Sequence, residues 1–286
     1  VRKKTEFQYY KFMNKIIIVA CVVLVNLLLS LSNLSAKDLY PGQSVSGQIG
    51  KFGLGTNIIL PEGNWVVAGV GSKNGTIRPA EFMLIQATGN KIKSVMFIRY
   101  ARDFGRPQSW DDNRGWRATE IIDNNTCDDY DDQKSNFHYK KVNKKKNILF
   151  VDGSCMAVYA LNDIYNLNEL RLDNSIEDTY QMAERFMKQN QLIYPNALIF
   201  IDNTFFSKDN YVQIYYGLNP EFRNIDTLPE RYFTDSDWHK YNIDKYSEKS
   251  NFMDEVIYFG KRAFDYNVDR FSDNKPLDFY TYGELN

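Results

Sequence analysis

Residues 81–100 read EFMLIQAT-GN-KIKSVMFIRY, and this stretch decides the fold. Two runs rich in apolar and β-branched residues flank Gly89-Asn90, a pair typical of a two-residue β-hairpin turn. Apolar residues fill both alternating faces over 82–87 and 95–98, which predicts strands that are covered on both sides. Helices later in the chain are the candidates to cover the second face.

Sequence on either side of this hairpin extends the same pattern. Residues 40–104 read as antiparallel β, residues 147–165 resume β character, and residues 196–218 predict another hairpin. Apolar residues recur at helical spacing after Ser175 and again over 250–271. We therefore predict an α+β fold, a mainly antiparallel β-sheet with two amphipathic helices packed on it.

The N-terminal region has the layout of a secretory signal peptide. A short basic segment at Met13–Lys15 precedes the apolar run Ile16–Leu31, and small residues follow up to Ala36. The apolar run is short for a permanent membrane span, so we expect cleavage after Ala36; an uncleaved anchor is the alternative. Residues 1–12 add charge before an already complete signal, which favours translation from Met13 rather than Val1.

The domain prediction follows from this layout. Residues 1–36 are an extension and signal peptide, residues 37–271 a single α+β domain, and residues 272–286 a weakly attached tail. Removing five basic and one acidic residue with the leader changes the formal net charge from −1 to −5. Such a charge gives no broad electrostatic reason to bind nucleic acid.

Two cysteines, Cys127 and Cys155, remain after processing, and an even count in an exported chain predicts a disulfide. The bridge would close a polar segment and contribute roughly 3.5 kcal/mol in the chain-entropy model. The alternative is a catalytic thiol at Cys155, for which only His138 or His239 could supply an imidazole base. Neither histidine lies in a recognisable motif.

The run VVAGVGSKNG at residues 66–75 superficially resembles a cofactor loop. Its glycines, Gly69, Gly71 and Gly75, are spaced one residue too widely for a dinucleotide fingerprint, and Pro79 follows instead of a helix. We interpret the run as a strand followed by a turn.

Charged clusters give no strong metal or polyanion signal. Asp128, Asp129, Asp131 and Asp132 lack the glycine and distal glutamate of a calcium loop, although a hard cation is conceivable there. The lysines of residues 140–146 lie in the same cysteine-bounded segment, so we expect a self-neutralising exposed loop and, over 102–146, only short strands. We assign no catalytic, cofactor-binding or metal-binding residue.

One enzymatic alternative stays open. Glycoside hydrolysis needs two carboxylates that are close in space, and these can be distant in sequence. The candidates lie near Trp110 and Trp116, and they are Glu81, Asp103, Asp111 and Asp112.

The segment Asp235–Phe271 contains a Trp, a polar spacer and an amphipathic helix with Gly-Lys in its middle. With the export signal and two cysteines, it resembles uncharacterised exported proteins of Gram-negative bacteria, a resemblance that implies no activity. We expect a periplasmic or secreted protein without a permanent membrane span after processing. Its expected role is a non-enzymatic binding or structural component of the cell envelope with an envelope partner or glycan; the alternative is an envelope glycan hydrolase.

Overall fold

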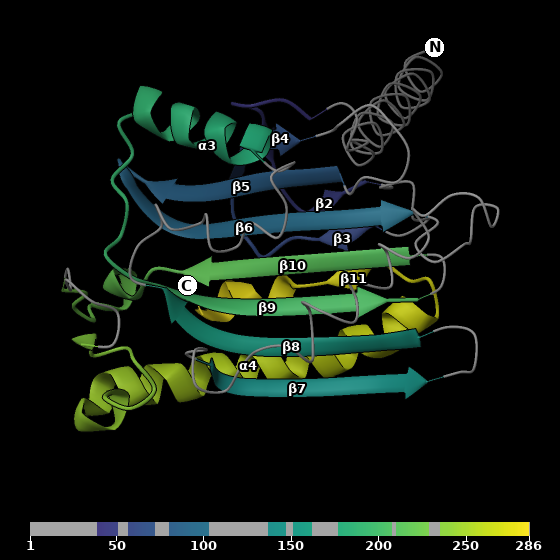
Figure 1. The fold of residues 1–286 in the computed structure, drawn as a ribbon. Helices are drawn as coiled ribbons and strands as arrows, with labels where there is room; N and C mark the ends of the chain where they lie inside the picture. The colour runs from purple at the N-terminus through teal and green to yellow at the C-terminus, as the bar shows by residue number, and fades with distance from the viewer. Residues whose placement is uncertain are drawn as a thin grey trace, which may run out of the picture.

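The computed structural model describes residues 39–50, 57–71, 80–102, 137–146, 151–161, 177–207, 210–228 and 235–285. An eight-stranded antiparallel sheet dominates these residues, and a few helices accompany it, which confirms the predicted α+β class (Figure 1). Its strand order is β1-β4-β5-β6-β10-β9-β8-β7. The bounds are β1 Ser44–Val45, β4 Trp65–Gly71, β5 Ala80–Thr88, β6 Lys91–Arg102, β7 Phe137–Lys146, β8 Val151–Leu161, β9 Leu198–Phe206 and β10 Asn210–Leu218.

The predicted hairpins form the centre of this sheet. Thr88 pairs with Lys91 across the Gly89-Asn90 turn, as the two-residue loop predicts. The second predicted hairpin is β9–β10, which pairs Phe206 with Tyr211 next to its turn. β6 and β10 then join the two hairpins, pairing over the whole of β10 and over residues 94–102 of β6. Every one of these strands therefore has a neighbour on each side, in agreement with their apolar residues on both faces.

Two helices cover opposite faces of the sheet. α3, Glu177–Gln189, packs on β4 and β5, whereas α4, Ser247–Ser272, packs on β8 and β9 from the other side (Figure 1). Each helix faces its own hydrophobic core: Ala183 and Met187 belong to one core, Val256 and Phe264 to the other. The fold confirms both predicted helices.

Glycines in β4 let α3 approach closely. A Cβ atom on Gly69 would lie 2.3 Å from the Thr179 carbonyl oxygen, and one on Gly71 would lie 1.9 Å from Thr179 Oγ1. Both distances are far below van der Waals contact. The glycines of the VVAGVGSKNG run that the structure describes thus serve helix packing on a strand, and the turn predicted after this strand lies outside the described residues.

The C-terminal residues and a small second sheet complete the α4 side. β11, Leu277–Asp278, pairs with β3, Ile58–Ile59, which pairs in turn with β2, Gln48–Ile49. The 3-10 helix η7, Tyr280–Leu285, follows and buries its Tyr282 ring against Tyr216, with ring centroids 4.9 Å apart. The expectation of a weakly attached tail is therefore wrong, because this segment buries large apolar side chains and continues a sheet.

A second correction concerns the lysine-rich segment. Residues 137–146 form the ten-residue strand β7 at one end of the described sheet, where only short strands and an exposed loop were expected. Lys140 is exposed, and Lys141 donates a 2.5 Å hydrogen bond to Asp265 of α4. A strand rich in lysine at the end of a sheet discourages pairing with other chains, which explains the charge there without an anionic ligand.

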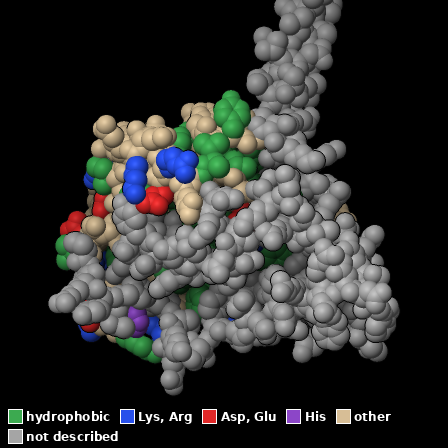
Figure 2. Space-filling view, turned by 45° about the horizontal axis from the view of Figure 1, so that its top comes forward, with side chains coloured by type: hydrophobic (Ala, Val, Ile, Leu, Met, Phe, Trp, Pro, Cys, Tyr) green, Lys and Arg blue, Asp and Glu red, His purple; other side chains and the backbone are tan. Residues whose placement is uncertain are grey.

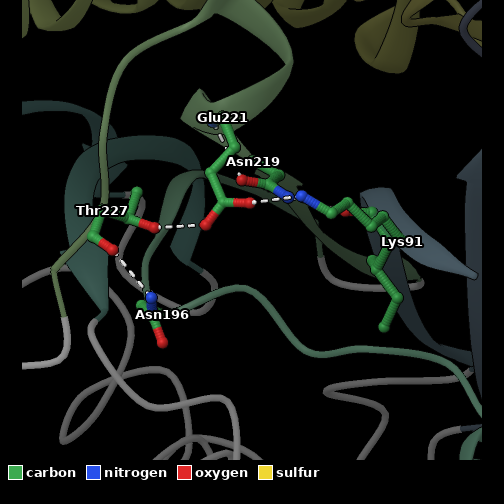
Figure 3. A network of polar contacts seen from close by, with 6 residues as sticks. Lys91, Asn196, Asn219, Glu221 and Thr227 are labelled. Atoms are coloured by element: carbon green, nitrogen blue, oxygen red, sulfur yellow. Dashed lines mark hydrogen bonds and ion pairs between the residues drawn. The ribbon is translucent and has the colours of Figure 1, made fainter.

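Polar contacts connect residues 219–227, which follow β10, to the start of β6 and to Asn196, just before β9. Glu221, in the 3-10 helix η4 (Pro220–Arg223), accepts a 2.6 Å hydrogen bond from Thr227 and lies 3.6 Å from Lys91 Nζ (Figure 3). Asn196 donates to the Thr227 carbonyl, and Asn219 donates to the backbone at the start of β6. The contacts satisfy these groups, so we interpret this network as structural.

Candidate functional site

Six polar side chains lie buried on the face of the main sheet that carries α3, and we call them the polar cluster. None of them is more than 5% exposed. They come from four adjacent strands, β5, β6, β10 and β9. The members of the polar cluster are Glu81, Arg99, Asp202, Thr204, Tyr211 and Gln213.

Strand register builds the cluster. Glu81 stands opposite Arg99, and Arg99 stands opposite Gln213. Gln213 in turn stands opposite Thr204, so these four residues form a row across the sheet. Side chains two positions apart on a strand share a face, and this places the remaining two members beside the row.

Arg99 is the best-anchored charge in the cluster. Its Nε donates a 2.7 Å hydrogen bond to Glu81 Oε1, and its guanidinium carbon lies 5.8 Å from the centre of the Phe97 ring. Burial alone would lower the pKa of Arg99, but the Glu81 carboxylate, helped by nearby tyrosines, raises it overall. The guanidinium therefore stays charged, as a paired and buried arginine does.

Gln213 connects this ion pair to Asp202. Its Oε1 accepts a 2.7 Å hydrogen bond from the Tyr211 hydroxyl and lies 3.5 Å from Arg99 Nη1. Its Nε2 donates to both carboxylate oxygens of Asp202, at 3.5 and 3.4 Å. The contacts of Gln213 with Arg99 and with Asp202 are thus at the long limit of hydrogen bonding. These polar groups could form shorter hydrogen bonds to a ligand.

Burial raises the pKa of Asp202 to about 7, although hydrogen bonds from Gln213 and Thr204 and the charge of Arg99 oppose this rise. Burial also raises the pKa of the Tyr211 hydroxyl well above its ordinary value, against the lowering effect of Arg99. Near neutral pH the cluster consequently contains an aspartic acid poised between its neutral and charged forms.

Two polar atoms beside the cluster have no hydrogen-bond partner among the described residues. Arg99 Nη2 is one, and Thr179 Oγ1, in the first turn of α3, is the other. Thr179 lies against Gly71, which stands opposite Glu81 and so continues the row. An unsatisfied buried polar atom costs about 1–3 kcal/mol, and more if it is charged, so such an atom in a native structure calls for an explanation.

The structure describes only some of the candidates taken from the sequence. Glu81 belongs to the polar cluster, whereas the other proposed carboxylates lie outside the described residues: Asp103, Asp111 and Asp112. The four aspartates of residues 128–132 lie outside them too. Where the chain is described, no three His, Cys, Asp or Glu side chains come together as a metal site would require.

Cys155 is buried in β8 and stands opposite Thr204, immediately beside the cluster. Its proposed partner Cys127 lies outside the described residues, so the disulfide stays a prediction. His138, one of the two candidate bases for a catalytic thiol, has another partner. His138 donates a 2.9 Å hydrogen bond to the Trp238 carbonyl oxygen, and burial is the main cause of its lowered pKa.

The sequence analysis missed five of the six cluster residues, although a signal was present. Arg99, Asp202 and Gln213 each interrupt a run of apolar residues that is covered on both faces. A polar residue at such a position must be buried, so polar interruptions of central strands mark candidate sites. Only the register between strands shows that these polar side chains lie side by side in the folded sheet.

The face shown in Figure 2 has no single charge sign over its described part, where basic, acidic and apolar side chains are mixed. None of the helices in the described ranges has both the length and the apolar character needed to cross a membrane. No protein family model, curated protein or solved structure matches this chain. The geometry of the polar cluster is therefore the main evidence about function.

Proposed function

We propose that this chain is an exported, non-enzymatic binding protein of the cell envelope and that its polar cluster binds a small polar ligand. The observation that carries the proposal is the buried Arg99, whose Nη2 has no partner among the described residues. Glu81 fixes this guanidinium through its Nε, so the remaining N–H groups are held in place for a ligand.

Energetics support a functional role for the cluster. Replacing buried ion pairs with apolar residues is often neutral or stabilising, so stability alone does not favour six polar side chains at this position. Long contacts, such as 3.5 Å from Arg99 Nη1 to Gln213 Oε1, leave the network incompletely satisfied. Incomplete polar networks in native proteins are concentrated at functional sites.

The location in the cell envelope rests on the sequence. The leader that ends at Ala36 predicts export, and Cys127 and Cys155 predict a disulfide formed in an oxidising compartment. In this setting the ligand is a small molecule or glycan of the envelope.

A glycan hydrolase is the second candidate. Asp202, with its pKa of about 7, could act as a general acid, and the cluster holds a second carboxyl group at Glu81. The ion pair between Glu81 and Arg99 weighs against this role, because it commits one carboxylate oxygen to a 2.7 Å contact.

Native mass spectrometry of the protein purified from a periplasmic extract tests the proposal. We expect a co-purifying small molecule of defined mass, which the variant Gln213→Met fails to retain because it loses the hydrogen bonds at the centre of the cluster. The matched control is Lys91→Met, which changes an ion pair outside the cluster and should retain the molecule.

Two outcomes would contradict the proposal. Equal retention by wild type and Gln213→Met would separate binding from the cluster, and a wild type that retains nothing would remove its basis. Release of new reducing ends from envelope glycans, abolished in Asp202→Asn, would instead support the hydrolase.

A further inference from the structure

We infer that the ligand of the polar cluster carries a carboxylate, which binds the open edge of the Arg99 guanidinium. This inference rests on the proposed binding function and adds the chemical class of the ligand.

The geometry of Arg99 is the first step. Its Nε faces Glu81 at 2.7 Å, its Nη1 lies 3.5 Å from Gln213 Oε1, the Tyr211 hydroxyl also interacts with the guanidinium, and its Nη2 has no partner in the described parts of the chain. The open edge is therefore the Nη1–Nη2 side. Two parallel N–H groups at this side match the two oxygens of a carboxylate.

The surroundings of Arg99 favour a planar group. The Phe97 ring lies against the guanidinium, and the rings of Tyr180 and Tyr215 pack on Phe97 at centroid distances of 5.2 and 5.8 Å. Aromatic walls exclude water and strengthen charge-assisted hydrogen bonds. They also provide apolar contact for the body of an organic acid.

Charge balance distinguishes carboxylate from phosphate. Arg99 is the one cation in the cluster, and Glu81 already offsets its charge. Adding a dianion would leave a large uncompensated charge in a buried place, which is costly. Burying a monoanion that takes hydrogen bonds from Arg99 and from a neutral acid nearby costs less free energy than burying a dianion.

Asp202 is this neutral acid. Its carboxyl group contacts Gln213 and Thr204, interacts with the charge of Arg99, and lies close enough to Tyr211 and Tyr282 to affect their ionisation. With a pKa of about 7, Asp202 donates a hydrogen bond when protonated and repels an anion when ionised. Affinity for a carboxylate should therefore fall as the pH rises from 6 to 8.

Two matched pairs of probes test the inference on the wild-type protein by ligand-observed NMR titration. Benzoate is compared with benzamide, and glucuronate with glucose, so that each pair differs in its carboxylate. We expect the acid to bind at least about tenfold more tightly than its neutral partner at pH 6, because it alone forms the charge-assisted pair.

Variants then assign the carboxylate contact. Arg99→Lys keeps the positive charge but loses the two parallel N–H groups of the guanidinium. It should therefore weaken the binding of the acids about tenfold or more and leave the affinity for the neutral probes unchanged. Asp202→Asn keeps a donor at every pH, so it should bind the acids with an affinity that does not change between pH 6 and 8. Circular dichroism checks that both variants are folded.

The outcomes separate this inference from the proposed function. Preference for the acids, lost in Arg99→Lys, supports it. Equal binding of acids and neutral partners, or an unchanged preference in Arg99→Lys, overturns it and leaves a neutral-ligand site intact. Absence of binding by either acid also overturns it, while the molecule retained in native mass spectrometry still decides the proposed function.

Discussion

At the scale of single residues, Asp202 is the most unusual group in the described structure. It lies in the middle of β9, where it follows Ile201 and is 5% exposed, and its hydrogen bonds to Gln213 and Thr204 are long. Most buried carboxylates are stabilised by a close cation, which lowers their pKa. Here burial dominates, so the neutral form of Asp202 is favoured in the folded state.

The pKa of Asp202 predicts how stability depends on pH. In the unfolded chain this group titrates near its ordinary value of 3.8, and in the folded state it titrates at about 7. Between these values the folded state holds one more proton, so the free energy of unfolding falls as pH rises, by up to about 1.4 kcal/mol per pH unit. Asp202→Asn removes this dependence.

Urea unfolding of wild type and Asp202→Asn at pH 5, 6, 7 and 8 measures the effect. We expect the stability of the wild type relative to the variant to decrease up to about pH 7 and then to level off. Asp273→Asn is the control for removing one carboxylate, because Asp273 is exposed and lies outside the polar cluster. A constant difference between wild type and Asp202→Asn at every pH would contradict the prediction.

At the scale of secondary-structure elements, local sequence predicts much of the fold. The Gly89-Asn90 turn and its flanking apolar runs predict β5 and β6, and helical spacing predicts α4 to within a few residues. The lysine-rich strand β7 was not predicted, because its charged residues have low strand propensity and its place beside β8 provides the pairing. Tertiary contacts override propensity in such a strand.

The polar cluster could not be predicted in the same way. Glu81 and Arg99 belong to one hairpin, but Arg99 and Gln213 meet only because β6 and β10 pair over a long separation in sequence. No local pattern fixes this pairing or its register. The sequence shows which polar residues interrupt central strands, and the fold decides which of them meet.

The contact between β4 and α3 gives a prediction for one glycine. Gly71→Ala would place a methyl group 1.9 Å from Thr179 Oγ1, so either the Thr179 side chain must rotate or α3 must move away from the sheet. We expect a loss of about 1–3 kcal/mol in the free energy of unfolding, as for other overpacked cores. Chemical denaturation of the purified variant measures this loss.

A double-mutant cycle identifies the cause. Thr179→Ala removes the hydroxyl that the added methyl group would meet, although the Cβ atom of residue 179 stays 3.3 Å away. Gly71→Ala should therefore cost less in the Thr179→Ala background than in wild type. Equal costs in the two backgrounds would show that the glycine serves something other than the approach of α3.

At the scale of the whole molecule, pairing of β6 with β10 unites the two hairpins, and α4 with the C-terminal residues closes one face. Asn203 of β9 donates a 2.9 Å hydrogen bond to the Tyr282 hydroxyl, which connects the sheet to the last helix of the chain. Trp238 and Lys249 make a similar junction at the start of α4, where Lys249 lies 2.7 Å from Asp237 and 5.4 Å from the Trp238 ring. Both ends of the described chain also belong to one hydrophobic core, because Leu39 and Leu285 are buried in the same cluster.

The predicted disulfide between Cys127 and Cys155 would act at this same scale, because it would tie a polar segment to the main sheet through β8. Its loss frees the segment in the unfolded chain more than in the folded one, so reduction should lower the free energy of unfolding by about 2–4 kcal/mol.

We expect protein prepared from the periplasm to give no maleimide adduct when denatured without reductant and two after reduction. The variant Cys127→Ser/Cys155→Ser should match the reduced protein in stability and should not respond to reductant. Two adducts before reduction would contradict the bridge and, with it, the support that the cysteines give to export.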